Sequence, residues 1–121
     1  MINGSPYPTF RYRAENVRGD PVIQEFLRRI APLRDRLQKI VLFGSRARGD
    51  EKPYSDYDIL IVVEEKERPL IDALYDATQE VLYVTERLIS FKIYKRVDFE
   101  RFAAIPTPFM ANVLREGIPL G

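Results

Sequence analysis

Apolar residues in the first third of the chain recur at the spacing of an amphipathic helix. Asp20 is a typical N-cap and Pro21 suits the first helical position, so a helix is predicted to start there. Its apolar face consists of residues three or four apart, namely Ile23, Phe26, Leu27 and Ile30. Pro32 cannot continue a helix without losing a backbone hydrogen bond, so this helix is predicted to end or kink there, and residues 33–37 are compatible with one further turn.

Two apolar runs, residues 39–43 and 57–63, have the length and composition of buried strands. The segment between them, residues 49–55, is rich in turn-forming residues. Residues 88–94 alternate instead, which predicts a strand with one apolar and one polar face. The apolar side is formed by Ile89, Phe91 and Ile93, and the polar side by Ser90, Lys92 and Tyr94.

The remaining periodic segments have a helical spacing. Residues 69–85 place their apolar members on one face and predict a long helix. Shorter helices are predicted at residues 97–104 and 109–116, the second ended by Gly117 as its C′ residue. The resulting order, α-β-turn-β-α-β-α-α, predicts an α/β or α+β fold with a small sheet.

One domain is expected, because 121 residues suit a single hydrophobic core. It is expected to span residues 20–121. Residues 1–19 mix Pro, Gly and Asn with aromatic residues and show no period, so they are interpreted as an irregular N-terminal arm.

The amino-acid composition excludes several classes of binding site and catalytic mechanism. The chain has 19 Lys and Arg against 18 Asp and Glu, so it lacks the basic balance of a dedicated nucleic-acid binder. The absence of Cys and His excludes disulfides, the usual zinc sites, thiol nucleophiles and imidazole catalysis. No apolar run approaches the ~20 residues of a membrane helix and no secretion signal is visible, so a cytoplasmic location without membrane contact is expected.

Two aspartates mark the start of the second predicted strand. Asp56 and Asp58 are two residues apart, so on a strand they project from the same face, roughly 6–7 Å apart along the chain. Paired carboxylates suit Mg²⁺ or Mn²⁺, completed by water and substrate phosphates. Metal ions held in this way stabilise the attacking and leaving oxygens of phosphoryl transfer.

A Gly-Ser pair lies just upstream of the aspartates. Gly44 allows the backbone to approach a phosphate closely, and Ser45 lies where a strand gives way to a helical turn, whose free N–H groups bind anions. Arg46 and Arg48 add positive charge nearby. Together with the aspartates, these residues are interpreted as a phosphate cradle that faces a metal site.

Simpler interpretations stay open for several of these residues. Ser55 and the aspartates are also typical of a loop that caps itself ahead of a strand. Arg46 and Arg48 are equally compatible with solvated charges on a helical turn. Lys92 and Tyr94 are compatible with ordinary surface residues on the open face of their strand.

The combined motif, G-S-x-x-x-G at residues 44–49 followed by S-D-x-D at residues 55–58, resembles the signature of the DNA polymerase β-like nucleotidyltransferases. The small size resembles the minimal nucleotidyltransferases of bacteria and archaea, and the resemblance extends from residue 20 to the C-terminus. It implies a small mixed sheet flanked by helices. It also implies that the triphosphate is bound by Gly44 and Ser45, and that the catalytic and Mg²⁺-binding pair is Asp56 and Asp58. Arg46 and Ser55, which lie in or beside the same motif, are predicted to join the nucleotide-binding residues.

One departure from the family pattern concerns a third acidic residue on a later strand, which acts there as base and ligand. The corresponding position in this chain is expected to be Ser90, which cannot replace a carboxylate as a base. Glu86 is the nearest acidic residue, but it lies at the start of the predicted strand.

Two functions follow from the resemblance. The first is Mg²⁺-dependent transfer of a nucleoside monophosphate from a nucleoside triphosphate to a hydroxyl of a protein or small molecule. The acceptor site is then expected to come from a partner or from the second subunit of a homodimer. The alternative is a weakly active or inactive nucleotide-binding module, similar to an antitoxin, that acts with a small helical HEPN-type protein.

Overall fold

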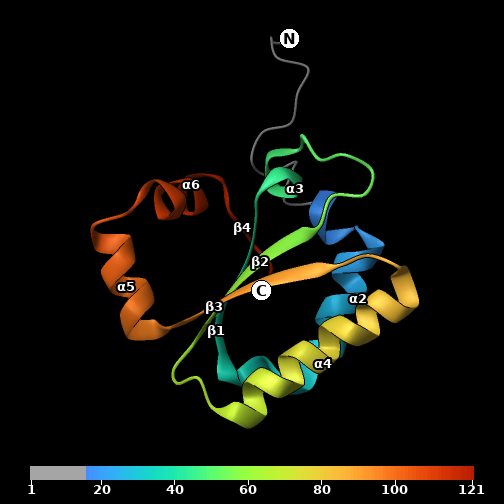
Figure 1. Cartoon of the computed structure of the whole chain (residues 1–121), viewed down its shortest axis with the longest axis horizontal. Coiled ribbons are helices and arrows are strands. Elements are labelled where there is room, and N and C mark those ends of the chain that lie inside the picture. The colour runs from blue at the N-terminus through green and yellow to red at the C-terminus, as the bar shows by residue number, and fades with distance from the viewer. Residues whose placement is uncertain (1–15) are drawn as a thin grey trace.

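The computed structural model describes residues 16–121. A mixed four-stranded sheet lies between two layers of helices, α2 with α4 on one face and α5 with α6 on the other (Figure 1). The strand order is β3-β2-β1-β4; β3 is parallel to β2, whereas β1 is antiparallel to both β2 and β4. The elements are α2 Pro21–Ile30, the 3₁₀ helix η1 Ala31–Arg36, β1 Leu37–Phe43, α3 Ser45–Arg48, β2 Tyr57–Val63, α4 Arg68–Thr85, β3 Ile89–Lys95, α5 Arg96–Ala104, α6 Pro108–Glu116 and β4 Ile118–Pro119. The predicted α+β fold is thus confirmed.

The central strand β2 is buried on both faces, which explains its unbroken apolar run. Ile59, Ile61 and Val63 belong to the core beneath α2 and α4. Leu60 and Val62 belong to a second core beneath α5 and α6. Because each buried aliphatic side chain contributes about 1.5–3 kcal/mol, this strand is firmly held in place.

Helix α2 starts and stops where its sequence predicts. One carboxylate oxygen of Asp20, Oδ1, accepts hydrogen bonds from the backbone N–H groups of Val22 at 2.8 Å and Ile23 at 3.4 Å. The α-helix ends at Ile30, because Pro32 cannot supply the next N–H donor, and the chain continues as the 3₁₀ helix η1.

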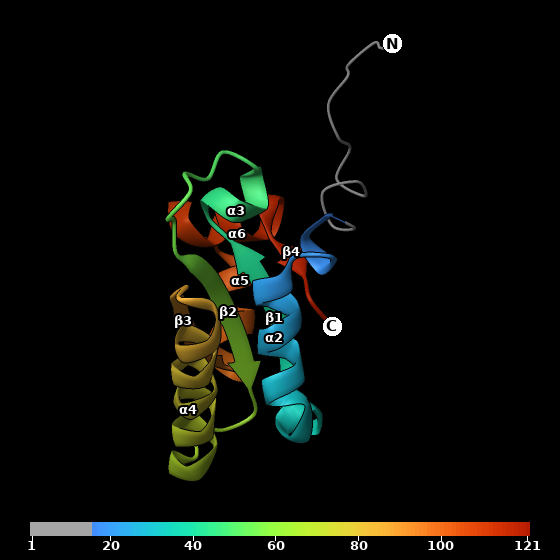
Figure 2. The ribbon, with the colours of Figure 1, turned by 90° about the vertical axis from the view of Figure 1, so that its right-hand side faces the viewer.

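Helix α4 is amphipathic and covers the same face of the sheet as α2 (Figure 2). It begins at Arg68, one residue before the predicted start. Its buried residues are Leu70, Leu74, Ala77, Thr78 and Val81. Among residues 16–121, no helix combines the length and the apolar character that crossing a membrane requires.

Some element boundaries differ from the predictions. β1 starts at Leu37, two residues early, and the two-residue strand β4 was not predicted because it is too short to show a pattern. The expected arm lies mostly outside the described residues. Its residues 16–18 are helical, and the side chain of Val17 is buried in the core.

The polar side of β3 is less open than its alternation predicts. Helix α5 follows directly after this strand and, with α6, packs over the same face of the sheet. Tyr94 therefore contacts the core beneath these helices, and its ring centroid lies 5.9 Å from that of Phe102. The interpretation of Tyr94 as an open surface residue was wrong, whereas Ser90 and Lys92 remain exposed.

Gly117 ends α6, but for a different reason than predicted. Its N–H donates to the carbonyl of Val113 at 2.8 Å, and its φ is −65°, so it is not the left-handed residue that usually ends a helix. A Cβ at this position would lie 2.5 Å from the Val113 carbonyl oxygen and 2.6 Å from Cγ1 of Val41. The close approach of α6 to β1 therefore requires glycine here.

Gly117→Ala is expected to destabilise the fold by about 1–3 kcal/mol, because the added methyl overpacks this contact. Chemical denaturation of the variant beside the wild type measures the change. Gly121→Ala is the matched control, because a Cβ there would lie no closer than 3.4 Å to any atom. Equal stability of Gly117→Ala and the control would contradict the assignment.

Candidate functional site

The two aspartates of the S-D-x-D motif lie at the start of the central strand β2. This end of β2 lies near α3 (Figure 2). Asp58 is the second residue of β2 and projects from the face that carries Leu60 and Val62. Asp58 is half-buried. Asp56 lies just before the strand and is exposed, and its charge acts on Asp58.

Gly44 packs directly against Asp58. Its φ of +77° favours glycine, and a Cβ at this position would lie 2.4 Å from Oδ2 of Asp58. Phe43 is the residue paired with Asp58 across β1 and β2, so the strand register sets this contact. The turn into α3, which starts at Ser45, thus lies beside Asp58, as the sequence predicts. The first N–H groups of a helix have no partner within it and are available to an anion.

The electrostatic environment of Asp58 opposes its charge. Partial burial, followed by repulsion from Asp56, raises the pKa of Asp58 above its ordinary value. Arg48 and Lys92 act in the opposite direction but do not cancel these effects. Two neighbouring carboxylates held in this way are stabilised by a bound cation.

The carboxylates fit a magnesium ion whose coordination shell is completed by a substrate. Within residues 16–121, no group of three or more acidic, His or Cys side chains is arranged to hold a metal ion. Mg²⁺ commonly uses only one or two carboxylates and completes its shell with water and phosphate oxygens. Asp56 and Asp58 meet that requirement, so the site suits a metal that arrives with a phosphate ligand.

Ser90 lies level with Asp58 on the neighbouring strand. The two residues are paired in the parallel register of β2 and β3, and both side chains lie on the same face. The predicted placement of Ser90 beside Asp58 is confirmed, whereas its correspondence to the family's third acidic position stays a prediction. Glu86 instead ends α4 in a left-handed conformation with φ 59°, outside the paired part of β3.

Lys92 extends the site along β3. It follows Ser90 by two residues, so it lies on the same face, and its charge acts on Asp58. Its Nζ lies 6.0 Å from the ring centroid of Phe109, whose ring packs edge-on against Phe43 at 5.4 Å. The alternation of β3 indicates this position, although the sequence alone does not distinguish Lys92 from an ordinary surface residue.

The two arginines of α3 point to different places. Arg48, whose charge lowers the pKa of Asp58, also lies 3.7 Å from the Glu116 carboxylate. Arg46 instead places its guanidinium 4.0 Å from the ring centroid of Tyr57, a side chain on the other face of β2. Arg48, rather than Arg46, therefore lies on the carboxylate side.

Arg46 and Ser55, the predicted phosphate ligands, both form hydrogen bonds within the loop that precedes β2. The Nε of Arg46 donates to the carbonyl of Ser55 at 3.0 Å. The Ser55 hydroxyl accepts a hydrogen bond from the backbone N–H of Lys52 at 2.9 Å. Ser55 thus closes a turn ahead of the strand, which is the simpler interpretation that its sequence left open.

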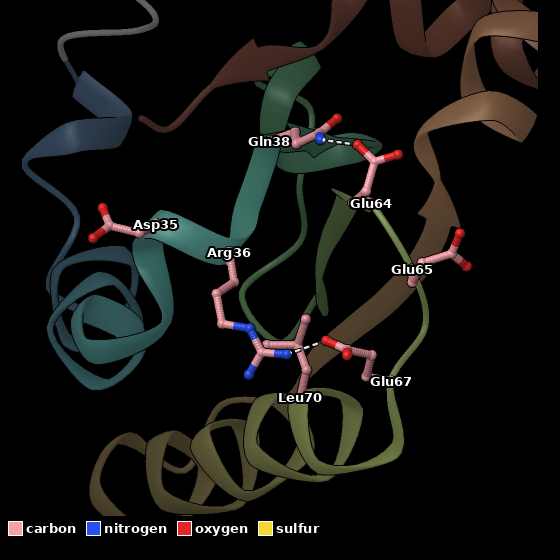
Figure 3. A pocket seen from close by; sticks show the side chains of 7 residues that line it. All are labelled: Asp35, Arg36, Gln38, Glu64, Glu65, Glu67 and Leu70. Atoms are coloured by element: carbon pink, nitrogen blue, oxygen red, sulfur yellow. Dashed lines mark hydrogen bonds and ion pairs between the residues drawn. The ribbon is translucent and has the colours of Figure 1, made fainter.

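A groove lined mainly by charged side chains lies at the opposite end of β2 (Figure 3). Glu64 accepts hydrogen bonds from Arg96 at 3.0 and 3.1 Å and from Gln38 at 2.8 Å, and these bonds, those from Arg96 first, lower its pKa. Arg36 forms an ion pair with Glu67. Since these carboxylates already have cationic or amide partners, the groove does not resemble the site at Asp58.

Comparisons with known proteins bear on the family and the fold. Residues 25–120 match the polymerase beta nucleotidyltransferase family. The chain is 35% identical over 105 residues to "Putative protein adenylyltransferase MJ0141" of Methanocaldococcus jannaschii, covering 80% of this chain and 93% of that protein. "Putative protein adenylyltransferase MJ0604" of the same organism is 50% identical over 44 residues, 36% of this chain and 44% of that protein. The crystal structure of a toxin–antitoxin with AMP-PNP has the same fold, with TM-score 0.57 and 17% identity over 82% of this chain and 72% of that one.

Asp58→Asn is expected to raise the melting temperature at pH 7 by a few degrees. Because the pKa of Asp58 is raised in the folded state, its favourable contribution to stability is present at acidic pH and is lost as the pH rises through that pKa. The advantage of the variant should therefore shrink as the pH falls toward about 4, near the ordinary pKa of an aspartate.

Thermal unfolding of both proteins across this pH range is the measurement. Asp76→Asn serves as control, because Asp76 is exposed on α4, outside the site at Asp58. A lower melting temperature of Asp58→Asn at pH 7 would show that the carboxylate stabilises the fold.

Proposed function

Because this chain belongs to the polymerase beta nucleotidyltransferase family, we propose that it transfers a nucleoside monophosphate from a nucleoside triphosphate to a hydroxyl group. The observation that carries the proposal is the packing of Gly44 against Asp58, which places the start of α3 beside a carboxylate pair. The adenylyltransferase description of the relatives favours ATP as the nucleotide and a protein as the acceptor.

Each residue of the site has a distinct role in this proposal. Asp56 and Asp58 hold Mg²⁺ or Mn²⁺, which when bound offsets negative charge on the phosphates. The backbone at Ser45 binds a phosphate oxygen. Arg48 and Lys92 offset the charge that the departing pyrophosphate carries.

Ser90 limits what the chain does alone. At the position level with Asp58 it offers a hydroxyl, which does not accept the proton of an attacking alcohol as a carboxylate does. This observation favours a second function, that of a nucleotide-binding, antitoxin-like module with a small helical HEPN-type partner. A homodimer and a cytoplasmic location remain compatible with either function.

Magnesium with ATP is expected to raise the melting temperature, because a ligand that binds only the folded state stabilises it by mass action. The gain is about 2.7 kcal/mol at a hundredfold excess over Kd. Asp56→Asn combined with Asp58→Asn should abolish the part that depends on metal, measured as the difference between Mg²⁺ and EDTA. An unchanged melting temperature of the wild type at millimolar ligand would contradict a working site.

Ser90→Asp is expected to increase transfer of labelled AMP, because it places a carboxylate beside Asp58. A missing base typically lowers a rate by ~10²–10⁴-fold, so the wild type alone should be slow. The assay measures label on a candidate HEPN-type acceptor, and Ser90→Asn is the control of similar shape without charge. Rapid transfer to this acceptor by the wild-type chain, which keeps Ser90, would overturn the role assigned to Ser90.

A further inference from the structure

Arg46 contacts both neighbours of Asp56. Its Nε donates to the carbonyl oxygen of Ser55 at 3.0 Å, and its guanidinium carbon lies 4.0 Å from the ring centroid of Tyr57. Asp56 is the residue between them and lies outside the paired strand. Asp56 is exposed and lies in a loop, but its position is fixed through the residues on either side of it.

Tyr57 is in turn held on the face of the sheet that α2 and α4 cover. Its side chain is 4% exposed, and its hydroxyl donates to Oδ2 of Asp20 at 2.7 Å. The other oxygen of Asp20 caps α2, so one carboxylate links the start of a helix to the start of β2. The backbone N–H of Tyr57 also donates to the carbonyl of Leu88, ahead of β3, at 3.0 Å.

We propose that Arg46, Tyr57 and Asp20 form a brace that positions the Asp56 carboxylate relative to Asp58. The inference rests on the proposed function, in which these two carboxylates share a metal ion. Metal ligation tolerates little displacement, and mutation of a residue that orients a ligand typically lowers metal affinity by about 10–100-fold. Arg46 is in this account a positioning residue and not a phosphate ligand.

Arginine is required at this place by its shape. A planar guanidinium stacks on an aromatic ring while one of its N–H groups keeps a fixed direction, whereas the ammonium of lysine is a compact charge on a flexible stem. The stacked face and the hydrogen bond to Ser55 use separate parts of the same group. Charge alone does not reproduce this arrangement.

The test compares Arg46→Lys with Arg101→Lys. Arg101 is a matched control because its guanidinium carbon lies 5.3 Å from the Phe102 ring centroid and it bonds to Asp98 at 3.1 Å, on α5. Binding of Mn²⁺ with AMP-PNP is followed by electron paramagnetic resonance, far below the melting temperature of each variant. A structural role alone lowers the melting temperature without changing the Mn²⁺ affinity of the folded protein.

Arg46→Lys is expected to weaken Mn²⁺ binding at least about tenfold and to shift the amide resonance of Asp56 in the ligand-free protein. Arg101→Lys should change neither quantity. Tyr57→Phe, which keeps the ring but loses the bond to Asp20, should weaken binding by a smaller factor.

Two results would overturn the brace, and they differ in what they say of the proposed function. If Arg46→Lys and Tyr57→Phe bind Mn²⁺ as the wild type does, while Asp58→Asn does not bind it, the metal site stands and the brace is wrong. If the wild type and Asp58→Asn bind Mn²⁺ equally, the metal site itself is wrong, and the brace falls with it.

Discussion

The burial of β2 on both faces is the constraint on which the rest of the structure depends. Residues 59–63 alternate between two cores, so a shift of one residue would turn every one of these side chains to the wrong side. Asp58 directly precedes these residues, near the start of β2. Its place is therefore fixed by the apolar residues that follow it, and the site gains its rigidity from the core.

The site exists because helices α5 and α6 cover only part of one face of the sheet. Helices α5 and α6 bury Leu60 and Val62 but leave the neighbouring positions, Asp58 and Ser90, outside the core. Asp58 consequently lies at the boundary between apolar side chains and water, where partial burial raises its pKa. The charged form of such a carboxylate does not stabilise the fold, but it is suited to binding a cation.

In the proposed function, nucleotide binding and turnover would depend on different parts of this arrangement. The carboxylates and the turn at Gly44 would bind the metal and the phosphates, and of these residues Asp58 and Gly44 are held by strand register and close packing. Proton transfer from an acceptor would involve the position of Ser90. A chain with this arrangement would then bind a nucleotide and turn it over slowly, which connects the proposed enzyme with the proposed antitoxin-like module.

The local sequence determined the elements whose signals are short-range. The N-cap at Asp20, the stop at Pro32 and the continuous run of β2 each depend on neighbouring residues only, and each was predicted correctly. The same period of two that defines a strand also predicted that Ser90 shares a face with Lys92. The motif at residues 44–58 correctly indicated that Gly44 and Asp58 lie together.

The tertiary structure alone decided which side chains reach the site. Arg46 and Arg48 are two residues apart on one helical turn, and nothing local assigns one to Tyr57 and the other to Asp58. Tyr94 continues the polar alternation of β3, yet α5 covers it. Both outcomes depend on contacts between segments far apart in the chain. Packing distances between whole elements, which no sequence pattern encodes, therefore decided them.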